Sequence, residues 1–285
     1  MQSKLISVNK TLRIRGKIID LSNPKVMGIL NVTPDSFYDG GKNTTERDLL
    51  KRTEKMLDEG ADFIDIGGYS SRPGADDISL EEEWNRVRPA VQSIQKEFPQ
   101  AILSIDTFRS QVAYRAILEG GDIINDISAG QLDADMFKTV AGLQVPYVIM
   151  HMRGTPQTMR GMTHYENLLR EMIDHFHTTL YQLNQQGIKD VIIDPGFGFA
   201  KTIEQNFELL NRLEQLHILG KPLLIGVSRK SMIWKTLGTT ADYALNGTTA
   251  LNTLALLKGA TFLRTHDVKE AKEVIRLIGV TQAAQ

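Results

Sequence analysis

The chain has 285 residues, of which 33 are Lys or Arg, 34 are Asp or Glu and none is Cys. A net charge of -1 argues against a nucleic-acid-binding protein, which would carry an excess of basic residues. Without cysteine there is no disulfide and no thiol nucleophile, so we expect a cytoplasmic location. No apolar run reaches the roughly 18 to 20 residues of a membrane helix, and we expect no membrane contact. Small molecules are the expected partners.

The length fits either two average domains or one large barrel of about 250 residues. Residues 1–22 are expected to form an extension with a short β-hairpin, because Leu12 and Ile14 alternate with polar residues before a break at Gly16. From Val26 onward, short apolar runs alternate with longer stretches of helical period. Apolar strands that are separated by crossover helices predict a parallel sheet.

Eight apolar runs are the predicted strands. They are Val26–Leu30, Phe63–Ile66, Ile102–Ile105, Ile123–Ile124, Pro146–Met150, Val191–Ile193, Pro222–Val227 and Thr261–Leu263. The predicted helices are Thr45–Glu59, Leu80–Lys96, Ser110–Glu119, Asp135–Ala141, Tyr165–Gln186, Ile203–Gln215, Asp242–Leu257 and Val268–Ile278. Eight strand–helix units without a linker favour one α/β fold, a (β/α)8 TIM barrel over residues 23–282, rather than two doubly wound domains.

Polar residues close each apolar run, and barrel enzymes carry their chemistry at the carboxyl ends of the strands. Any one of them alone would be interpreted as a loop residue that caps the next helix. Together they would converge on one mouth, where grouped carboxylates are costly unless they bind a ligand. They are Asn31, Asp65, Asp106, Asn125, Asp126, His151, Asp194, the segment Ser228–Lys230, Arg264 and His266.

The closing residues fall into two chemical groups. Asp106, Asn125 and Asp194 combine acceptors with an amide and fit the edge of a planar heterocycle. Arg264 and His266 lie two residues apart on an extended chain, so both should point the same way and form a cationic pair for phosphate or diphosphate. We therefore expect acids and cations to be segregated on the rim.

Other segments extend this mouth. Lys230 and Ser231 lie where a helix should begin and would favour an anion, unless Lys230 is a solvated surface lysine. Two long loops, Val32–Gly41 and Gly67–Asp77, have the small residues and turn chemistry of mobile lids. Phe199 is interpreted either as a core residue or as an aromatic wall for a flat ligand.

Two groups are expected to stay outside the site. His175 and His177 lack any partner at metal-ligand spacing and are interpreted as structural. The Glu81–Glu83 run is interpreted as a solvated first helical turn that complements the helix dipole.

Eight sequence segments, in order and at family spacing, carry a family resemblance from about Val26 to Val268. They read MGILNVTPDSFYDGG, DIGGYSSRPGA, SIDTFRS, INDISAG, HMRGTP, IIDPGFGFAKT, GVSRKS and LRTHDV. On these segments the chain resembles the dihydropteroate synthases. The resemblance implies a transferase of folate biosynthesis that joins 4-aminobenzoate to (7,8-dihydropterin-6-yl)methyl diphosphate by an SN1-like displacement and releases diphosphate. It also implies Mg2+, a homodimer and sensitivity to sulfonamides, which imitate aminobenzoate.

The resemblance assigns roles to residues at matching positions. Those for the pterin are Asp106, Asn125, Asp194 and Lys230. Those for the diphosphate are Asn31, Ser71, Arg264 and His266, with Asn31 also beside the metal. Those for aminobenzoate are Ser71, Arg72, Pro73, Phe199, Lys230 and Ser231. The catalytic set is Asn31, Asp65, Lys230, Arg264 and His266. Loop closure is assigned to Asp35, Ser36, Phe37 and Ser70.

The chain departs from the commonest family pattern at a few positions. Tyr69 stands where Glu is frequent, Ser71 where Thr is frequent, and Phe108–Arg109 where small or basic residues are more usual. Ser71 keeps the hydroxyl group of its position.

Three other functions are compatible with parts of the pattern. A methyltetrahydrofolate–corrinoid methyltransferase would share the pterin pocket but would not need the diphosphate pair or the SSRPG loop. A Schiff-base aldolase would use Lys230. A pterin-binding protein without catalysis would keep the fold, although the retained lids and anion residues argue against it.

Overall fold

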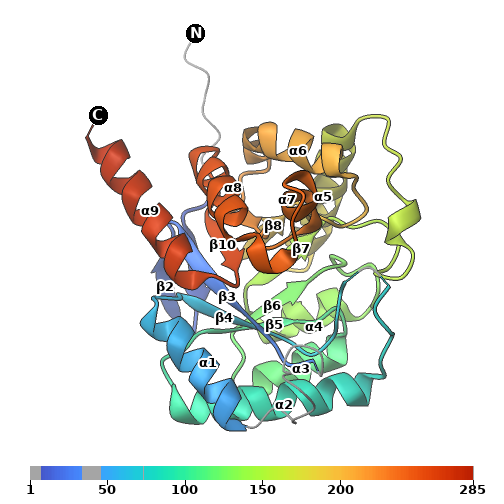
Figure 1. Cartoon of the computed structure of the whole chain (residues 1–285). Helices are drawn as coiled ribbons and strands as arrows, with labels where there is room; N and C mark the ends of the chain where they lie inside the picture. The colour runs from blue at the N-terminus through green and yellow to red at the C-terminus, as the bar shows by residue number, and fades with distance from the viewer. Residues whose placement is uncertain (1–7, 34–45, 73, 285) are drawn as a thin grey trace.

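The structure is a computed structural model of the chain that describes residues 8–33, 46–72 and 74–284. Within these residues, eight parallel strands form one sheet in the order β8-β7-β6-β5-β4-β3-β10-β9. A parallel bridge between Ile193 and Leu223 joins the two edge strands and closes the sheet into a barrel. Helices surround the strands in Figure 1. The predicted TIM barrel is therefore confirmed.

The strands coincide with the eight predicted apolar runs. They are β3 (Lys25–Asn31), β4 (Phe63–Gly67), β5 (Leu103–Asp106), β6 (Ile123–Asp126), β7 (Tyr147–Met150), β8 (Val191–Asp194), β9 (Leu224–Ile225) and β10 (Phe262–Thr265). Several extend through the polar residues that close the runs. β9 is shorter than its predicted run because the chain turns after Val227, whose carbonyl accepts from the Lys230 amide, and Arg229 adopts a positive φ of 56°.

The helices of the described residues match the predicted stretches, with one addition after β9. They are α1 (Glu46–Asp58), α2 (Leu80–Glu97), α3 (Ser110–Leu118), α4 (Met136–Leu143), α5 (Leu168–Gln185), α6 (Ile203–Asn211), α7 (Ser231–Thr236), α8 (Leu245–Leu257) and α9 (Val268–Ala283). The predicted helix after Thr202 ends at Asn211, because the chain continues as a 3-10 helix that buries Leu213 and Leu216 three residues apart. No described helix has the length and apolar character needed to span a bilayer.

A β-hairpin closes the floor of the barrel, at the amino ends of the strands. β1 (Thr11–Ile14) and β2 (Lys17–Asp20) pair antiparallel, and Leu12 and Ile14 are buried. They belong to one apolar cluster with Leu21, Met27, Phe63, Ile123, Val148, Ile192, Leu224 and Phe262. Arg15 fixes the hairpin through two bonds to the Asp122 carboxylate, at 2.7 and 2.8 Å. A larger apolar cluster fills the space between the barrel and its helices.

The prediction of a solvated Glu81–Glu83 turn is wrong for Glu83. Its side chain is fully buried, and its two oxygens accept from Thr107 Oγ1 at 2.5 Å and from Arg109 Nη1 at 2.6 Å. Burial raises the pKa of Glu83, while Thr107 and Arg109 oppose that shift. Charge alone could not separate this glutamate from its exposed neighbours, since its partners lie more than 20 residues away in sequence.

Arg109 also anchors the loop between β4 and α2. It donates to the Ile78 carbonyl at 2.5 Å and lies over the rings of Tyr69 and Phe108, 5.3 and 5.1 Å from their centroids. Those two rings meet edge to face at 5.0 Å. Gln157 donates to the Tyr69 hydroxyl at 2.8 Å. Tyr69, Phe108 and Arg109 therefore contact one another in the structure.

We predict that Arg109→Met destabilises the fold by about 3 kcal/mol at pH 8, because the buried Glu83 carboxylate loses its cation. A carboxyl group whose folded pKa is raised costs stability as the pH rises from the unfolded pKa through the folded pKa. The penalty should therefore be smaller at pH 5 than at pH 8, because a lower pH favours the protonated form of Glu83. Urea unfolding of the wild type and of Arg109→Met at both pH values measures this loss in the free energy of unfolding.

The matched control is Arg115→Met, since Arg115 pairs with Glu81 at 2.8 Å on the exposed face of the same region. An exposed pair contributes about 1 kcal/mol or less. Equal losses in the two variants, or a loss in Arg109→Met that does not change with pH, would contradict the role assigned to the Glu83–Arg109 pair.

Candidate functional site

The ends of four neighbouring strands bring three polar residues and one glycine to the same level of the barrel mouth. The register pairs Asn31 with Gly67, Gly67 with Asp106, and Asp106 with Asn125. A Cβ atom at Gly67 would lie 3.5 Å from both the Asn31 Oδ1 and the Asp106 Oδ2 atoms. The glycine therefore leaves room between the two side chains, and the strand ends form one continuous polar row.

Arg264 bonds Asp106 of this row and Asp65, which lies two residues before Gly67 on β4. Its Nε donates to Asp65 Oδ2 at 2.6 Å, and its Nη2 donates to Asp106 Oδ2 at 2.7 Å. Asp65 is fully buried, and Asn125 donates a further bond to the same Oδ2 at 3.1 Å. The expected segregation of acids and cations on the rim is thus wrong, because carboxylates buried this deeply need a cation.

Two of the mouth acids are harder to ionise than a free aspartate. Burial raises the pKa of Asp106 to about 7, against the attraction of Arg264, and Asp65 adds to the rise. Burial also raises the pKa of Asp194 at the end of β8, against the charge of Lys230. Asp194 Oδ1 accepts from the Gly196 amide at 2.7 Å. Both acids can therefore still accept hydrogen bonds from the N–H groups of a ligand, and such bonds would stabilise the ionised form.

Lys230 points into the mouth and is not a solvated surface lysine. Its Nζ donates to the Phe197 carbonyl and lies 4.8 Å from the centroid of the Phe199 ring. Burial lowers the pKa of Lys230 to about 8, while Asp194 opposes the shift. Phe197 is a core residue, whereas Phe199 is half-buried at the rim, so only Phe199 can offer a face to a ligand.

His266 is held by the end of β9 but does not form a second cation. Its Nδ1 lies 3.0 Å from the Ser228 hydroxyl oxygen. His266 is an exposed residue, yet desolvation of its ring lowers its pKa to about 4, and the charges of Arg264 and Arg229 add to the shift. The expected cationic pair is therefore one guanidinium and one neutral imidazole in the free protein.

The remaining predicted residues lie around this centre or outside the described part of the chain. Ser70 and Ser71 are half-buried in the loop after β4, Arg72 is exposed beside them, and Ser231 begins α7. The charge of Arg72 acts on His266, so the loops after β4 and β10 face the same mouth. Asp35, Ser36, Phe37 and Pro73 lie outside the described residues.

Two rim residues have structural partners instead. Asp126 is fully buried and accepts from the Tyr147 hydroxyl at 2.6 Å and from Ser128. His151 is buried against Lys201, whose Nζ lies 3.2 Å from the His151 Nδ1 atom. Sequence reasoning missed Lys201 altogether. The available signal was a lysine inside the FGFAKT segment, between a glycine-rich turn and the capping residue of α6.

The strand ends offer few protein ligands for the magnesium that the family resemblance implies. In the described residues no group of three or more His, Asp or Glu could hold a metal ion. Mg2+ commonly takes one or two protein oxygens and completes its shell with water and substrate phosphates. Asn31 offers one such oxygen, and Asp65 Oδ1 is buried without a hydrogen-bond partner in the described residues. The residues fit an ion that arrives with a phosphate ligand.

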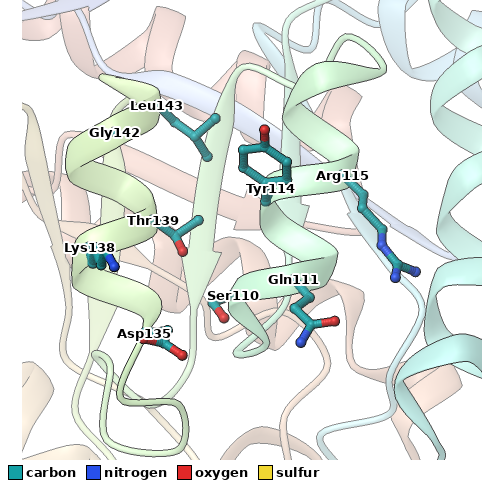
Figure 2. A pocket seen from close by; sticks show the side chains of 9 residues that line it. All are labelled: Ser110, Gln111, Tyr114, Arg115, Asp135, Lys138, Thr139, Gly142 and Leu143. Atoms are coloured by element: carbon teal, nitrogen blue, oxygen red, sulfur yellow. The ribbon is translucent and has the colours of Figure 1, made fainter.

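A groove of about 610 Å³ lies elsewhere, between α3 and α4 in the outer helical layer. Figure 2 shows its lining: Ser110, Gln111, Tyr114, Arg115, Asp135, Lys138, Thr139, Gly142 and Leu143. Its charged residues come from exposed helix faces, and Arg115 is already paired with Glu81. The strand ends gather the buried charges and perturbed pKa values, so they are the stronger candidate for the functional site.

Comparisons with known proteins show the family of the chain. A family model described as "Pterin binding enzyme" matches residues 27–266. The dihydropteroate synthase of Escherichia coli K12 is 40% identical over 277 residues, covering 95% of this chain and 96% of the relative. That of Haemophilus influenzae is 40% identical and covers 96% of this chain and 99% of the relative.

Solved structures give the same result. The Yersinia pestis dihydropteroate synthase in a sulfonamide drug complex superposes with a TM-score of 0.90 at 38% identity, covering 96% of this chain and 100% of the other. The Xanthomonas albilineans enzyme with 4-aminobenzoic acid gives a TM-score of 0.90 at 37% identity, covering 96% and 98%. The same enzyme with 7,8-dihydropteroate gives 0.86 at 35% identity, covering 96% and 99%. The chain belongs to the dihydropteroate synthase family of pterin-binding enzymes.

Proposed function

We propose that the barrel mouth binds (7,8-dihydropterin-6-yl)methyl diphosphate and 4-aminobenzoate and joins them by an SN1-like displacement. As a dihydropteroate synthase, the chain is an enzyme of folate biosynthesis that transfers the pterin-methyl group to 4-aminobenzoate. The observation that carries the site proposal is the convergence of Asp106, Asn125, Asp194 and Lys230 on one mouth around Arg264.

The pterin edge offers several N–H donors and ring acceptors to these side chains. Asp106 and Asp194 would accept from the ring N–H groups, and Asn125 and Lys230 would bind its acceptor atoms. A ligand that donates to a carboxylate favours the ionised form, so binding should lower the raised pKa values of both acids.

Departure of the diphosphate from the methylene carbon leaves a cation that the electron-rich pterin ring delocalises. Arg264, Asn31, Ser71 and His266 would stabilise charge that develops on the leaving oxygen, each well-placed donor contributing about 3 kcal/mol at the transition state. Asp65 would act by orienting Arg264, to which it is bonded. When bound, Mg2+ would supply further neutralisation of the diphosphate, held by Asn31.

The amine of aminobenzoate is uncharged near neutral pH, so no strong base is required and the protein mainly positions it and excludes water. We assign the aminobenzoate carboxylate to Lys230 and Ser231, its ring to Phe199, and the covering side to Ser71 and Arg72. Pro73, Asp35, Ser36, Phe37 and Ser70 complete the proposed closure. A sulfonamide should compete for the same place.

We further propose a homodimer that forms through α8 and α9. The thirteen residues of α8 include no charged side chain, yet Leu254 and Leu257 are 45% and 61% exposed. Leu277 and Val280 on the neighbouring α9 are 68% and 65% exposed. Figure 1 shows the two helices side by side on the outside of the barrel. A helix that faces water usually carries charged residues on its outer face. The uncharged outer face of α8, with exposed leucines, therefore fits contact with a second copy of the chain.

The assigned reaction predicts release of diphosphate only when both substrates are present, and loss of that release when Mg2+ is removed with a chelator. A coupled diphosphate assay measures both. In Asn31→Ala the Mg2+ concentration for half-maximal rate should rise. Release that is independent of aminobenzoate would exclude the synthase reaction, and trapping of a carbonyl substrate on Lys230 by borohydride would indicate an aldolase instead.

We predict that Asp194→Asn weakens pterin binding roughly 30-fold, or about 2 kcal/mol, because the amide keeps an acceptor for Gly196 but loses the charge that a ring N–H group favours. Asp106→Ala should also lose pterin affinity. Calorimetric titration with the pterin measures both. Asp190→Ala, which changes an acid next to the opposite end of β8, is the control. Unchanged affinity in Asp194→Asn and Asp106→Ala would remove these residues from the pterin pocket.

For the dimer, Leu254→Glu combined with Leu257→Glu should give monomers in sedimentation velocity, because paired carboxylates cannot be buried against a second apolar face. Leu118→Glu, at an equally exposed leucine of α3, should leave the wild-type mass unchanged. A monomeric wild-type protein at micromolar concentration would contradict the proposed dimer.

A further inference from the structure

Lys201 is a buried lysine whose ammonium group is surrounded by backbone carbonyls. The residue is 8% exposed. Its Nζ lies 3.0 Å from the Gly196 oxygen, 3.1 Å from the Phe199 oxygen, 3.4 Å from the His151 oxygen and 3.2 Å from the His151 Nδ1 atom. Within the described residues, the acceptors of Lys201 are therefore neutral groups, and three of them belong to the backbone.

These acceptors hold a tight turn between β8 and α6. Gly196, Gly198 and Ala200 have φ values of 72°, 80° and 48°. A Cβ atom at Gly196 would lie 2.1 Å from the His151 oxygen, so the turn approaches the end of β7 at backbone distance. Carbonyl dipoles that converge on one point repel each other unless a cation lies between them.

The turn forms the surface on which Lys230 rests. The Phe197 carbonyl accepts from Lys230 Nζ, and the Phe199 ring lies under the same ammonium group. A Cβ atom at Gly198 would lie 3.2 Å from the Lys230 Cδ atom, so the turn also packs against the stem of Lys230. Any shift of this turn would move both the Phe199 ring and the Lys230 ammonium group.

We propose that Lys201 is a positioning residue that locks the Gly196–Phe199 turn and thereby fixes Phe199 and Lys230 for the aminobenzoate side of the reaction. Lys201 itself lies behind the turn, and the bonds above engage it with His151 and with the turn's own carbonyls. The inference rests on the aminobenzoate assignment made above for Phe199 and Lys230.

The energetics favour a functional reason for a lysine at this position. Taking an ammonium group out of water is costly, and a well-packed apolar side chain of similar volume is usually as stable or more stable. Burial lowers the pKa of Lys201 to about 7, Asp194 opposes the shift, and Lys230 and Arg153 add to it. Burial and the charge of Lys201 lower the pKa of His151, so the imidazole that contacts Lys201 is a neutral acceptor. The charge of Lys201 therefore acts on the carbonyl groups of the turn and, through space, on Asp194.

The test compares Lys201→Met with a matched control, Lys221→Met. Lys221 donates one bond to the Lys189 carbonyl at 3.0 Å, next to the amino ends of β8 and β9, far from the mouth. In Lys201→Met, we expect the KM for aminobenzoate to rise about tenfold through misplacement of Phe199 and Lys230. The KM for the pterin diphosphate should rise less, since Asp106 is bonded to Arg264 and not to the turn, whereas Asp194 and Lys230 contact the turn. Lys221→Met should match the wild type.

Hydrogen exchange gives a readout that is independent of turnover. Amides of residues 196–201 should exchange faster in Lys201→Met, while those of β5 and β6 should not change. If Lys201→Met does not fold, Gly196→Ala tests the same turn, because its Cβ atom would clash with the His151 oxygen. Unchanged exchange in the turn, or equal rises of both KM values, would overturn the proposal. A wild-type protein without turnover would refute the proposed function, whereas exchange in the turn would still decide the locking role of Lys201.

Discussion

The pairing of Arg264 with Asp65 and Asp106 is the interaction on which the barrel mouth depends. Asp65 is fully buried, and an isolated carboxylate at that depth would either take up a proton or destabilise the fold. The guanidinium offers N–H donors in a fixed fork and bonds both acids, which lie on neighbouring strands. One side chain from the last barrel strand thus allows β4 and β5 to carry buried acids, while Asp106 and Asp194 can still accept hydrogen bonds from a ligand.

The opposite end of the barrel explains why such a mouth can be tolerated. The hairpin buries Leu12 and Ile14 against the floor, where every strand except β5 contributes an apolar residue to the floor cluster. Arg15 then seals the hairpin to Asp122 at the rim of that floor. Apolar packing therefore closes the amino ends of the strands, and the carboxyl ends are free to hold charged side chains.

The sequence was sufficient to predict the fold and to place the candidate site at the strand ends, because both predictions follow from local patterns. Apolar runs of two to six residues predicted the strands, and the polar residue after each run predicted the rim. Side-chain pairs could not be predicted from the sequence, since Arg264 is 199 residues from its partner Asp65, and Glu83 is 26 residues from its partner Arg109. The identity of Glu83 as a core residue and of Lys201 as a locked cation depends on such distant partners. Tyr69 and Phe108 were visible as departures from the family pattern, but only the structure brought them into contact.

Arg264, Lys201 and Lys230 are three cations of the mouth region. They differ in how many of their N–H groups are hydrogen-bonded, and this difference indicates what each of them does. Arg264 is bonded to two carboxylates, and Lys201 has four neutral acceptors around one nitrogen. The described bond of Lys230 goes to a single carbonyl, with an aromatic face beside it, and burial lowers its pKa to about 8. An ammonium group that is dehydrated but incompletely bonded gains most from a new anionic partner. Lys230 is therefore the cation that would gain most from a substrate carboxylate. Arg264 holds the acids of the strand ends, and Lys201 holds the turn on which Lys230 lies.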